Sequence, residues 1–288
     1  MKVWHYIFIF IFIVTFSQWI PALPKPLSSE FNVCDKLVVT SELYDFSNLN
    51  IVLLGDSETS IGGDLCDKPR GWNKWFAEAL KPASCRSYAR SGATWTNTTN
   101  TKKNCEEETG ILGDDNVIYN QVERLKAAVE AGKQVAPQLI IIAAGTNDAW
   151  FQKRRPGIFE INEAQAFSKQ DAFITDRKVN TITSLAESIR YNCELLMEAF
   201  PDAQIILITP MQAVAIETEE VMRVADVIET CGKWLNVGVV RMDAGGSLYR
   251  PREKMKHKFT YDGTHTNEKG ARRNGRYIAR QVASMLQF

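Results

Sequence analysis

The sequence predicts an α/β protein: a three-layer α/β/α sandwich in which helices cover both faces of a five-stranded parallel sheet. Two observations support this fold class. Five short apolar runs lack polar alternation, as is typical of parallel strands that are buried on both faces. Longer stretches with apolar residues at helical spacing lie between these runs. The expected strands are residues 50–54, 85–89, 139–144, 204–209 and 237–242.

The expected helices follow these strands along the chain. In the stretch 119–131, Val122, Leu125 and Val129 fall on one face of a helix. Pro201 then marks the step from the helix before it into the next strand. The polar segment 152–180 is long for a connection, and segments of this kind often border active sites. The expected helices are residues 72–80, 119–131, 183–200, 217–235 and 267–286.

The N-terminal segment 1–22 is typical of an export signal. Lys2 supplies positive charge, and residues 7–14 are an unbroken run of Ile, Phe and Val. This run is shorter than the roughly 20 apolar residues of a membrane span, but residues 3–20 can just span, so an uncleaved anchor is the alternative. We therefore expect a secreted or periplasmic protein without stable membrane insertion after signal removal. Residues 23–45 have the composition of a leader or linker, and 46–288 of one domain.

The charge balance argues against a nucleic-acid partner. The 288 residues include 34 acidic and 34 basic side chains, so no strong global field attracts polyanions. One local cluster is basic, and we interpret it as a solvated loop, with a cationic rim near the active site as the alternative. Its members are Arg250, Arg252, Lys254, Lys256 and Lys258.

Six cysteines permit disulfides in an exported chain. We expect a bridge between two of Cys66, Cys85 and Cys105, which fall near the loops of the expected active-site face. Free buried thiols are the alternative. No cysteine spacing is typical of a zinc site, and only two histidines follow the signal segment, so we expect no metal and no other cofactor.

Four short motifs follow expected strands, at the edge of the sheet where ligands bind in doubly wound folds. They are Gly55-Asp56-Ser57, Ser91-Gly92, Gly145-Thr146-Asn147-Asp148 and Asp262-Gly263-Thr264-His265. Ser57 and His265 are the residue types that acyl transfer requires, because imidazole can take the serine proton at neutral pH. Asp262 is placed to hold the imidazole in the right tautomer. Alone, Ser57 can be a helix N-cap and His265 a solvated loop residue; together, in order and at strand exits, they indicate a hydrolase.

The same motifs supply hydrogen-bond donors for an oxyanion. The backbone N–H of Ser57 opens an expected helix, Gly92 permits close approach of a second N–H, and the Asn147 amide is a third donor. The alternatives are an ordinary turn glycine and an Asx turn. We interpret Asp148 as a structural loop residue.

Over residues 50–287 the chain resembles the SGNH hydrolase superfamily, the GDSL-type esterases and lipases, in all four motifs. The resemblance implies a flavodoxin-like sheet, Ser57 as nucleophile, His265 as base and Asp262 as its partner. It also implies an oxyanion hole of Ser57, Gly92 and Asn147, and no metal. Two positions depart from the family pattern: Glu58 replaces the usual aliphatic residue after the serine, and Thr266 replaces the frequent proline after the histidine.

The substrate is expected to be a small-molecule or glycan ester. Trp95 and Trp150 each lie three residues after an oxyanion-hole position, and flat aromatic rings suit sugars; packing beneath loops is the alternative. With export, this favours removal of O-acetyl groups from carbohydrates. A lysophospholipase, a broad short-chain esterase and a catalytically weakened carbohydrate-binding module remain open. No oligomeric state is predicted.

Overall fold

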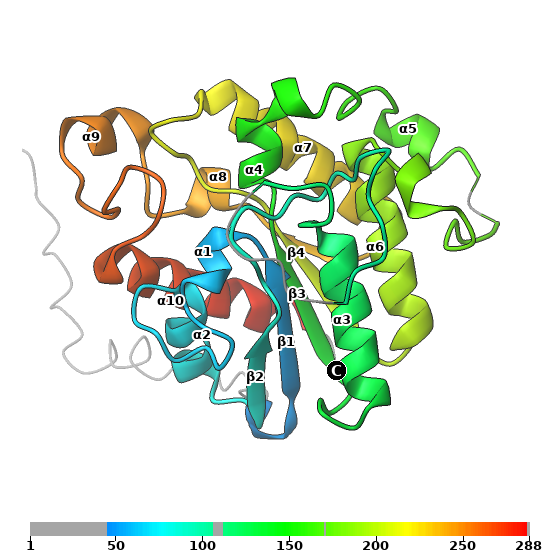
Figure 1. Ribbon diagram of the computed structural model, residues 1–288. Coiled ribbons are helices and arrows are strands. Elements are labelled where there is room, and N and C mark those ends of the chain that lie inside the picture. The colour runs from blue at the N-terminus through cyan, green and yellow to red at the C-terminus, as the bar shows by residue number, and fades with distance from the viewer. Residues whose placement is uncertain (1–44, 106–111, 170, 287–288) are drawn as a thin grey trace, which may run out of the picture. The chain divides into compact units, whose positions relative to one another are not determined.

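The computed structural model describes residues 45–105, 112–169 and 171–286 (Figure 1). The predicted signal segment and all but one residue of the predicted linker lie outside the described residues. The described chain contains a five-stranded, all-parallel sheet in the order β2-β1-β3-β4-β5. The predicted fold class is therefore confirmed, and each strand begins within one residue of its predicted position. The strands are β1 (Asn50–Gly55), β2 (Ser84–Ser87), β3 (Leu139–Ala143), β4 (Gln204–Ile208) and β5 (Gly238–Val240).

Long helices cover both faces of the sheet (Figure 1). On one face, α2 (Trp72–Leu80) packs closely against α10 (Glu268–Met285). The other face is covered by α3 (Ile118–Glu130), α6 (Leu185–Ala199) and α7 (Thr218–Leu235). These are the five predicted helices, with ends that shift by no more than two residues.

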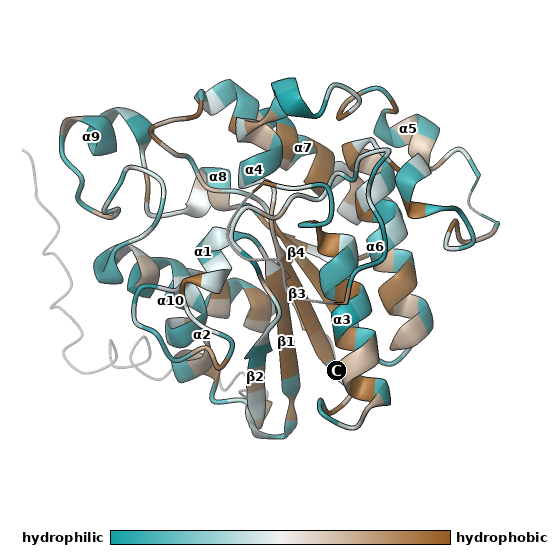
Figure 2. Ribbon diagram, in the orientation of Figure 1, coloured by the Kyte–Doolittle hydropathy of each residue, from teal (hydrophilic) through white to brown (hydrophobic). Residues whose placement is uncertain are grey.

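Successive side chains of each central strand point to opposite faces of the sheet, so the apolar core has two parts. In β1, Ile51 and Leu53 pack on the side of α2 and α10, while Val52 and Leu54 pack on the side of α3 and α6. All four side chains are fully buried. Because both faces of the strands are apolar, the middle of the sheet is the most hydrophobic part of the ribbon (Figure 2). Burial on two faces explains why these strands carry unbroken apolar runs.

Short helices also follow the strands, and of these the sequence predicted only the one that begins at Ser57. They are α1 (Ser57–Ser60), α4 (Thr146–Trp150), α8 (Met242–Gly245) and α9 (Arg250–Met255). The interpretation of the basic cluster as a loop is thus wrong for residues 250–255. Pro251 is compatible with this helix because the first turn of a helix leaves its N–H groups without partners. Arg250, the first residue of α9, forms an ion pair with Glu217 at 2.6 Å.

The long segment 152–180 is not a structureless loop. It contains η3 (Gln152–Arg154), α5 (Glu163–Ala166) and η4 (Val179–Thr181), and α5 packs on α6 and α7. A further 3-10 turn, η2 (Phe46–Asn48), precedes β1. None of the helices in the described ranges is long and apolar enough to cross a membrane.

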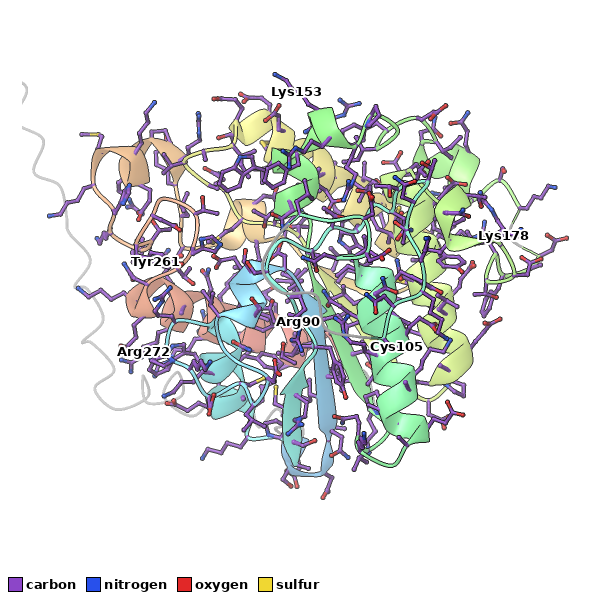
Figure 3. All side chains as sticks on the ribbon, in the orientation of Figure 1. Arg90, Cys105, Lys153, Lys178, Tyr261 and Arg272 are labelled. Atoms are coloured by element: carbon purple, nitrogen blue, oxygen red, sulfur yellow. The ribbon has the colours of Figure 1, made fainter. Side chains whose placement is uncertain are left out.

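The cysteines of the described part of the chain are free thiols. The Sγ atoms of Cys66 and Cys85 lie 3.3 Å apart, in contact but unbonded. Cys105, labelled in Figure 3, is exposed and bonds to no other cysteine of the described residues. The predicted disulfide is therefore absent from the described residues, although two of its three candidate cysteines are in contact.

The order in which the chain adds strands to the sheet changes direction at β1. The chain passes over one face of the sheet through α2 to reach β2, and over the opposite face through α3 to reach β3. The loops that leave the carboxyl ends of β1 and β3 consequently diverge, and in open α/β sheets this is the place where ligands bind. The four motifs lie in the loops at this end of the sheet.

Candidate active site

The turn that carries Ser57 is held rigidly at the end of β1. The side chain of Gln121 on α3 is fully buried; its Oε1 accepts from the Gly55 N–H and its Nε2 donates to the Gly55 carbonyl, both at 2.8 Å. Glycine is required at position 55, because a Cβ there would lie 2.3 Å from the carbonyl oxygen of Ala143 on β3. The sequence alone does not indicate Gln121, since its role depends on a contact between residues 66 positions apart.

Ser57 is the first residue of α1, as predicted, and Asp56 caps this helix by accepting from the Glu58 N–H at 3.1 Å. Ser57 is 6% exposed. Within the described residues, neither its N–H nor its hydroxyl makes a hydrogen bond. Both groups therefore remain available to a substrate.

The Gly92 loop lies directly beside this turn. The Arg90 N–H donates to the Gly55 carbonyl at 3.1 Å, which joins the two motifs. Gly92 has φ +82°, a left-handed conformation that favours glycine. Its N–H makes no hydrogen bond to any residue that the structure describes.

The Asn147 amide connects the third motif to the same loop. Asn147 lies on α4, is 6% exposed, and donates through Nδ2 to the Ala93 carbonyl at 2.9 Å. Since a side-chain amide has two N–H groups, one donor is left. The fully buried Asp148 accepts from the N–H groups of Trp95 and Thr96 at 2.9 and 3.0 Å. This is the structural loop role that the sequence analysis assigned to Asp148.

Asp262 and His265 form a hydrogen-bonded pair on one loop. Asp262 Oδ2 lies 2.7 Å from His265 Nδ1, and Asp262 Oδ1 accepts from the His265 N–H at 2.7 Å. Burial alone would raise the pKa of Asp262, but the bonds from the His265 ring and from the N–H groups of His265 and Thr264 lower it. Asp262 is thus held as the carboxylate, with the other ring nitrogen of His265 turned away from it.

Glu253 on α9 anchors the loop that leads to His265. Its carboxylate is fully buried, and Oε1 accepts from the Phe259 N–H, the Thr260 N–H and the Thr260 hydroxyl at 2.7–2.8 Å. Glu253 was not among the predicted site residues, because its segment was expected to be a solvated loop. A glutamate inside a run of basic residues was the only available signal.

Glu58 joins the first and last motifs. Its Oε1 accepts from the Thr266 N–H at 3.2 Å, and its Oε2 lies 3.1 Å from the Thr266 hydroxyl oxygen. Glu58 follows Ser57 directly and Thr266 follows His265 directly, so these contacts hold the two loops together. Ser57 and His265 are nevertheless not hydrogen-bonded to each other, and the Ser57 hydroxyl makes no hydrogen bond to any of the described residues.

Two acidic side chains beside Ser57 are easier to protonate than usual. Burial raises the pKa of Asp56 from 3.8 to about 6, in opposition to the Glu58 N–H and the nearby His265. Burial and the neighbouring Asp56 carboxylate raise the pKa of Glu58 from 4.5 to about 8, although bonds from Thr266 oppose this shift. The site therefore combines an ionised Asp262 with a neutral Glu58 at pH 7.

Trp95 and Trp150 have different positions. Trp95 is fully buried in the core on the α3 side of the sheet, so its ring is not available to a substrate. It therefore packs beneath the loops, which was the alternative to sugar binding. Trp150, at the end of α4, is 40% exposed and stacks on Phe151 with ring centroids 5.7 Å apart.

Tyr261 is an exposed aromatic residue that the sequence analysis missed. Its ring stacks on the ring of His265, with the two ring centroids 5.8 Å apart. The Arg70 guanidinium also lies over the Tyr261 ring, 4.1 Å from its centroid. Figure 3 labels Tyr261 on the loop between α9 and α10. Its position beside the candidate base depends on the loop conformation, which no local pattern predicted.

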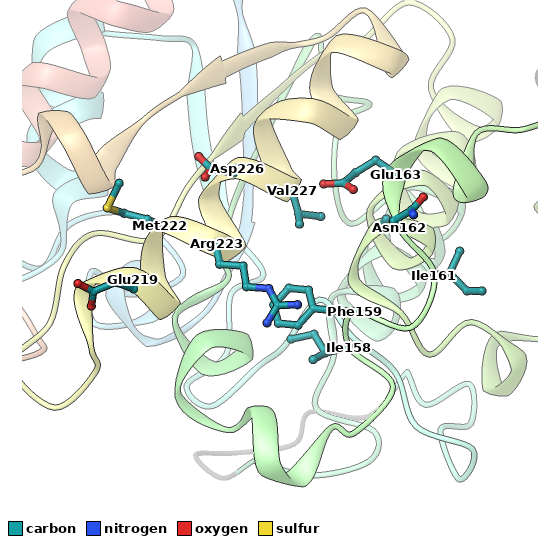
Figure 4. Close-up of a pocket in the computed structure, with 11 residues that line it drawn as sticks. Ile158, Phe159, Ile161, Asn162, Glu163, Glu219, Met222, Arg223, Asp226 and Val227 are labelled. Atoms are coloured by element: carbon teal, nitrogen blue, oxygen red, sulfur yellow. The ribbon is translucent and has the colours of Figure 1, made fainter.

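A cavity of about 450 Å³ lies away from these motifs, between α5 and α7 (Figure 4). Arg223 crosses it, with its guanidinium 3.6 Å from the ring centroid of Phe159. None of the four motifs contributes to its lining. In the described ranges, no cluster of three or more His, Cys, Asp or Glu side chains has the arrangement of a metal site.

Comparisons with known proteins show the family and the fold of the chain. Residues 53–273 match the model of the GDSL-like lipase/acylhydrolase family. None of the curated proteins compared with the chain matches it.

Among solved structures, the chain is similar to a possible lipase from Chitinophaga pinensis, with 16% identity, a TM-score of 0.50 and coverage of 82% of this chain and 97% of that one. It is also similar to a protein from Lactobacillus plantarum, with 12% identity, a TM-score of 0.54 and coverage of 84% and 99%. At these identities the likeness to solved structures bears on the fold alone. By the family match, the chain belongs to the GDSL-like lipase/acylhydrolase family of ester hydrolases.

Proposed function

We propose that the chain is an exported serine esterase in which Ser57 is the nucleophile, His265 the base and Asp262 the residue that orients His265. The observation that carries this proposal is the set of unengaged groups around Ser57. Its hydroxyl and N–H, the Gly92 N–H and one N–H of the Asn147 amide make no hydrogen bonds within the described chain. Ser57 and Asn147 are each only 6% exposed, and buried donors without a partner are costly unless a ligand engages them.

In the proposed reaction, His265 takes the Ser57 proton while Oγ attacks the carbonyl carbon of an ester. The resulting oxyanion accepts hydrogen bonds from Ser57, Gly92 and Asn147. His265 then gives its proton to the departing alcohol, and water repeats the sequence to release the acid and restore Ser57. The Ser57–His265 hydrogen bond forms when substrate binds, since catalytic hydrogen bonds are often long in the absence of substrate.

O-acetyl groups on carbohydrates are the proposed substrates. The N-terminal segment supports export to a compartment where such glycans occur. The exposed rings of Tyr261 and Trp150 replace the buried Trp95 as candidates for sugar contact. Tyr261 supports this most directly because it stacks on His265.

Two measurements test the proposal on the purified chain. The first compares hydrolysis of p-nitrophenyl esters of increasing acyl length with acetate release from acetylated glycans. We expect acetyl esters and acetylated glycans to be preferred; preference for long acyl chains would instead indicate a lysophospholipase. The second is labelling by a fluorophosphonate, which we expect at Ser57 in peptide mass spectra. A chain that binds glycans but is neither labelled nor hydrolytic would be a binding module, and the proposal would be wrong.

A further inference from the structure

The two positions at which this chain departs from its family pattern contact each other. Glu58 and Thr266 are 208 positions apart, yet both oxygens of the Glu58 carboxyl group face the Thr266 backbone and side chain. An aliphatic residue at 58 and a proline at 266 could not form this contact, because neither the carboxyl group nor the N–H would exist. The pair therefore functions as one unit, which we call the Glu58–Thr266 latch.

The number of protons available for hydrogen bonds within the latch favours a protonated, neutral Glu58. The Thr266 hydroxyl oxygen lies 3.0 Å from the Arg70 carbonyl and 3.1 Å from Glu58 Oε2. A hydroxyl has one proton to donate, and the Arg70 carbonyl can only accept. Both contacts are satisfied when Thr266 donates to Arg70 and a proton on Oε2 is donated to Thr266. The Thr266 N–H meanwhile donates to Oε1 at 3.2 Å.

The surroundings of Glu58 favour the same state. Glu58 and Asp56 both line a cavity of about 30 Å³ beneath the Ser57 turn, too small for a ligand much larger than water. Two carboxylates at one small cavity repel each other when both are ionised. Arg70, whose carbonyl accepts from Thr266, has its guanidinium stacked on the ring of Tyr261 rather than paired with Glu58. The charged or titratable groups around Glu58 are Asp56, Arg70, Tyr261, Asp262 and His265.

We propose that Glu58 is a positioning residue that, in its protonated form, holds the loop of His265 against the turn of Ser57 through Thr266. This inference rests on the proposed function, because it concerns the alignment of the proposed nucleophile and base. Ionisation of Glu58 removes the proton that Oε2 donates and adds a negative charge beside the oxyanion that forms. The latch therefore links activity to pH on the alkaline side, independently of His265.

Three variants separate positioning from packing. Glu58→Gln keeps the latch, since its amide oxygen accepts from the Thr266 N–H and its NH₂ donates to the hydroxyl, and it does not titrate. Glu58→Leu has similar size but forms no hydrogen bond. Thr266→Val removes only the hydroxyl. Glu78→Gln, on the exposed surface of α2, is the matched control for loss of one carboxyl group.

The first readout is the pH dependence of p-nitrophenyl acetate hydrolysis, corrected for spontaneous hydrolysis. In the unmodified chain and in Glu78→Gln, we expect kcat to fall as the pH rises through the titration of Glu58, near pH 8. Glu58→Gln should match the unmodified chain at pH 7 and show no such fall. Glu58→Leu and Thr266→Val should lose about tenfold to a hundredfold in kcat with little change in KM, as expected for misplaced reacting groups. The inference is overturned if Glu58→Gln keeps the alkaline fall, or if Glu58→Leu is as active as the unmodified chain.

The second readout does not require activity. Denaturant unfolding of the unmodified chain and of Glu58→Gln is compared between pH 5 and pH 9. Because folding favours the protonated acid, the unmodified chain should lose stability relative to Glu58→Gln as the pH rises toward 8. A constant difference across this range would show that Glu58 is not held as the acid. If the unmodified chain neither hydrolyses esters nor labels at Ser57, the proposed function fails, whereas this comparison still decides the state of Glu58.

Discussion

Asn147 donates a hydrogen bond of 2.9 Å through its side-chain amide to the carbonyl of Ala93, the residue after Gly92. This contact fixes the amide beside the second oxyanion-hole motif and leaves one of its N–H groups unused. Asn147→Ala should therefore lower kcat by about a hundredfold to a thousandfold, the usual effect of removing one oxyanion donor. KM should change little, because the donor acts on charge that develops in the transition state.

Asn97→Ala is the matched control for Asn147→Ala. The Asn97 amide makes a similar buried bond to the Ile182 carbonyl at 3.0 Å, outside the four motifs. We expect it to lower stability by about 1–3 kcal/mol, measured by denaturant unfolding, while kcat stays within a few-fold. Equal losses of kcat in the two variants would contradict an oxyanion role for Asn147.

Ser57→Ala should leave a folded chain that hydrolyses esters at least about a thousandfold more slowly. The Ser57 hydroxyl has no hydrogen-bond partner in the described residues, so its removal should change the stability by no more than about 0.5 kcal/mol. Hydrolysis of p-nitrophenyl acetate and a thermal melt measure both effects. Retained activity in a variant with an unchanged melt would exclude Ser57 as the nucleophile.

Asp56→Asn should stabilise the chain at neutral pH but not in acid. The folded chain keeps the Asp56 proton up to about pH 6, whereas the unfolded chain releases it near the usual pKa of 3.8. The stability that the protonated acid contributes is complete below pH 3.8 and is lost as the pH rises through about 6. Asparagine caps helices as well as aspartate and does not ionise.

The unfolding free energies of the two chains should therefore be similar near pH 3.5. At pH 7 they should differ by about 2–3 kcal/mol in favour of Asp56→Asn, since one pKa unit corresponds to 1.36 kcal/mol. Denaturant titrations at four pH values between 3.5 and 7 measure this difference. An aspartate that ionises freely in the folded chain would give a difference independent of pH, contrary to this expectation.

Oxidised glutathione should join Cys66 and Cys85 in a disulfide, with release of two molecules of reduced glutathione. Their sulfur atoms are already in contact at 3.3 Å and must approach to about 2.05 Å. The closed loop of about 19 residues should raise the stability by about 3 kcal/mol. Peptide mass spectra without reductant and unfolding with and without reductant measure the product and its effect.

The matched control for oxidation is Cys85→Ser. It removes the bridge but retains a small polar side chain, and its stability should not respond to oxidised glutathione. Cys193 and Cys231 are fully buried and should remain free in both chains. Alkylation of both Cys66 and Cys85 after oxidation would contradict the predicted bridge.

Much of the fold was predictable because it depends on local patterns. The run at 139–144 is apolar on both sides of a strand, and the helix predicted at 72–80 has the bounds of α2. The predicted helical start at Ser57 is also present, since Asp56 is a good N-cap. These features require only neighbouring residues, so the chain order of amino acids is enough to indicate them.

The other short helices and the loop anchors could not be predicted in this way. Helix α9 is six residues long, and its Glu253 is buried because the loop at 259–260 supplies three donors to it. Trp95 was expected near the substrate, but the contacts of its loop turn it into the core. In both cases the decisive partners come from elements that are distant in sequence.

The sequence by itself determined the layered α/β fold, the order of the motifs and the pairing of Asp262 with His265, because each follows from residue type and short spacing. Only the tertiary structure decided how the loops at the strand ends meet. It brings Glu58 to Thr266, Gln121 to Gly55 and Asn147 to Ala93. Such contacts depend on where whole elements pack, and packing is a property of the complete core rather than of any one segment.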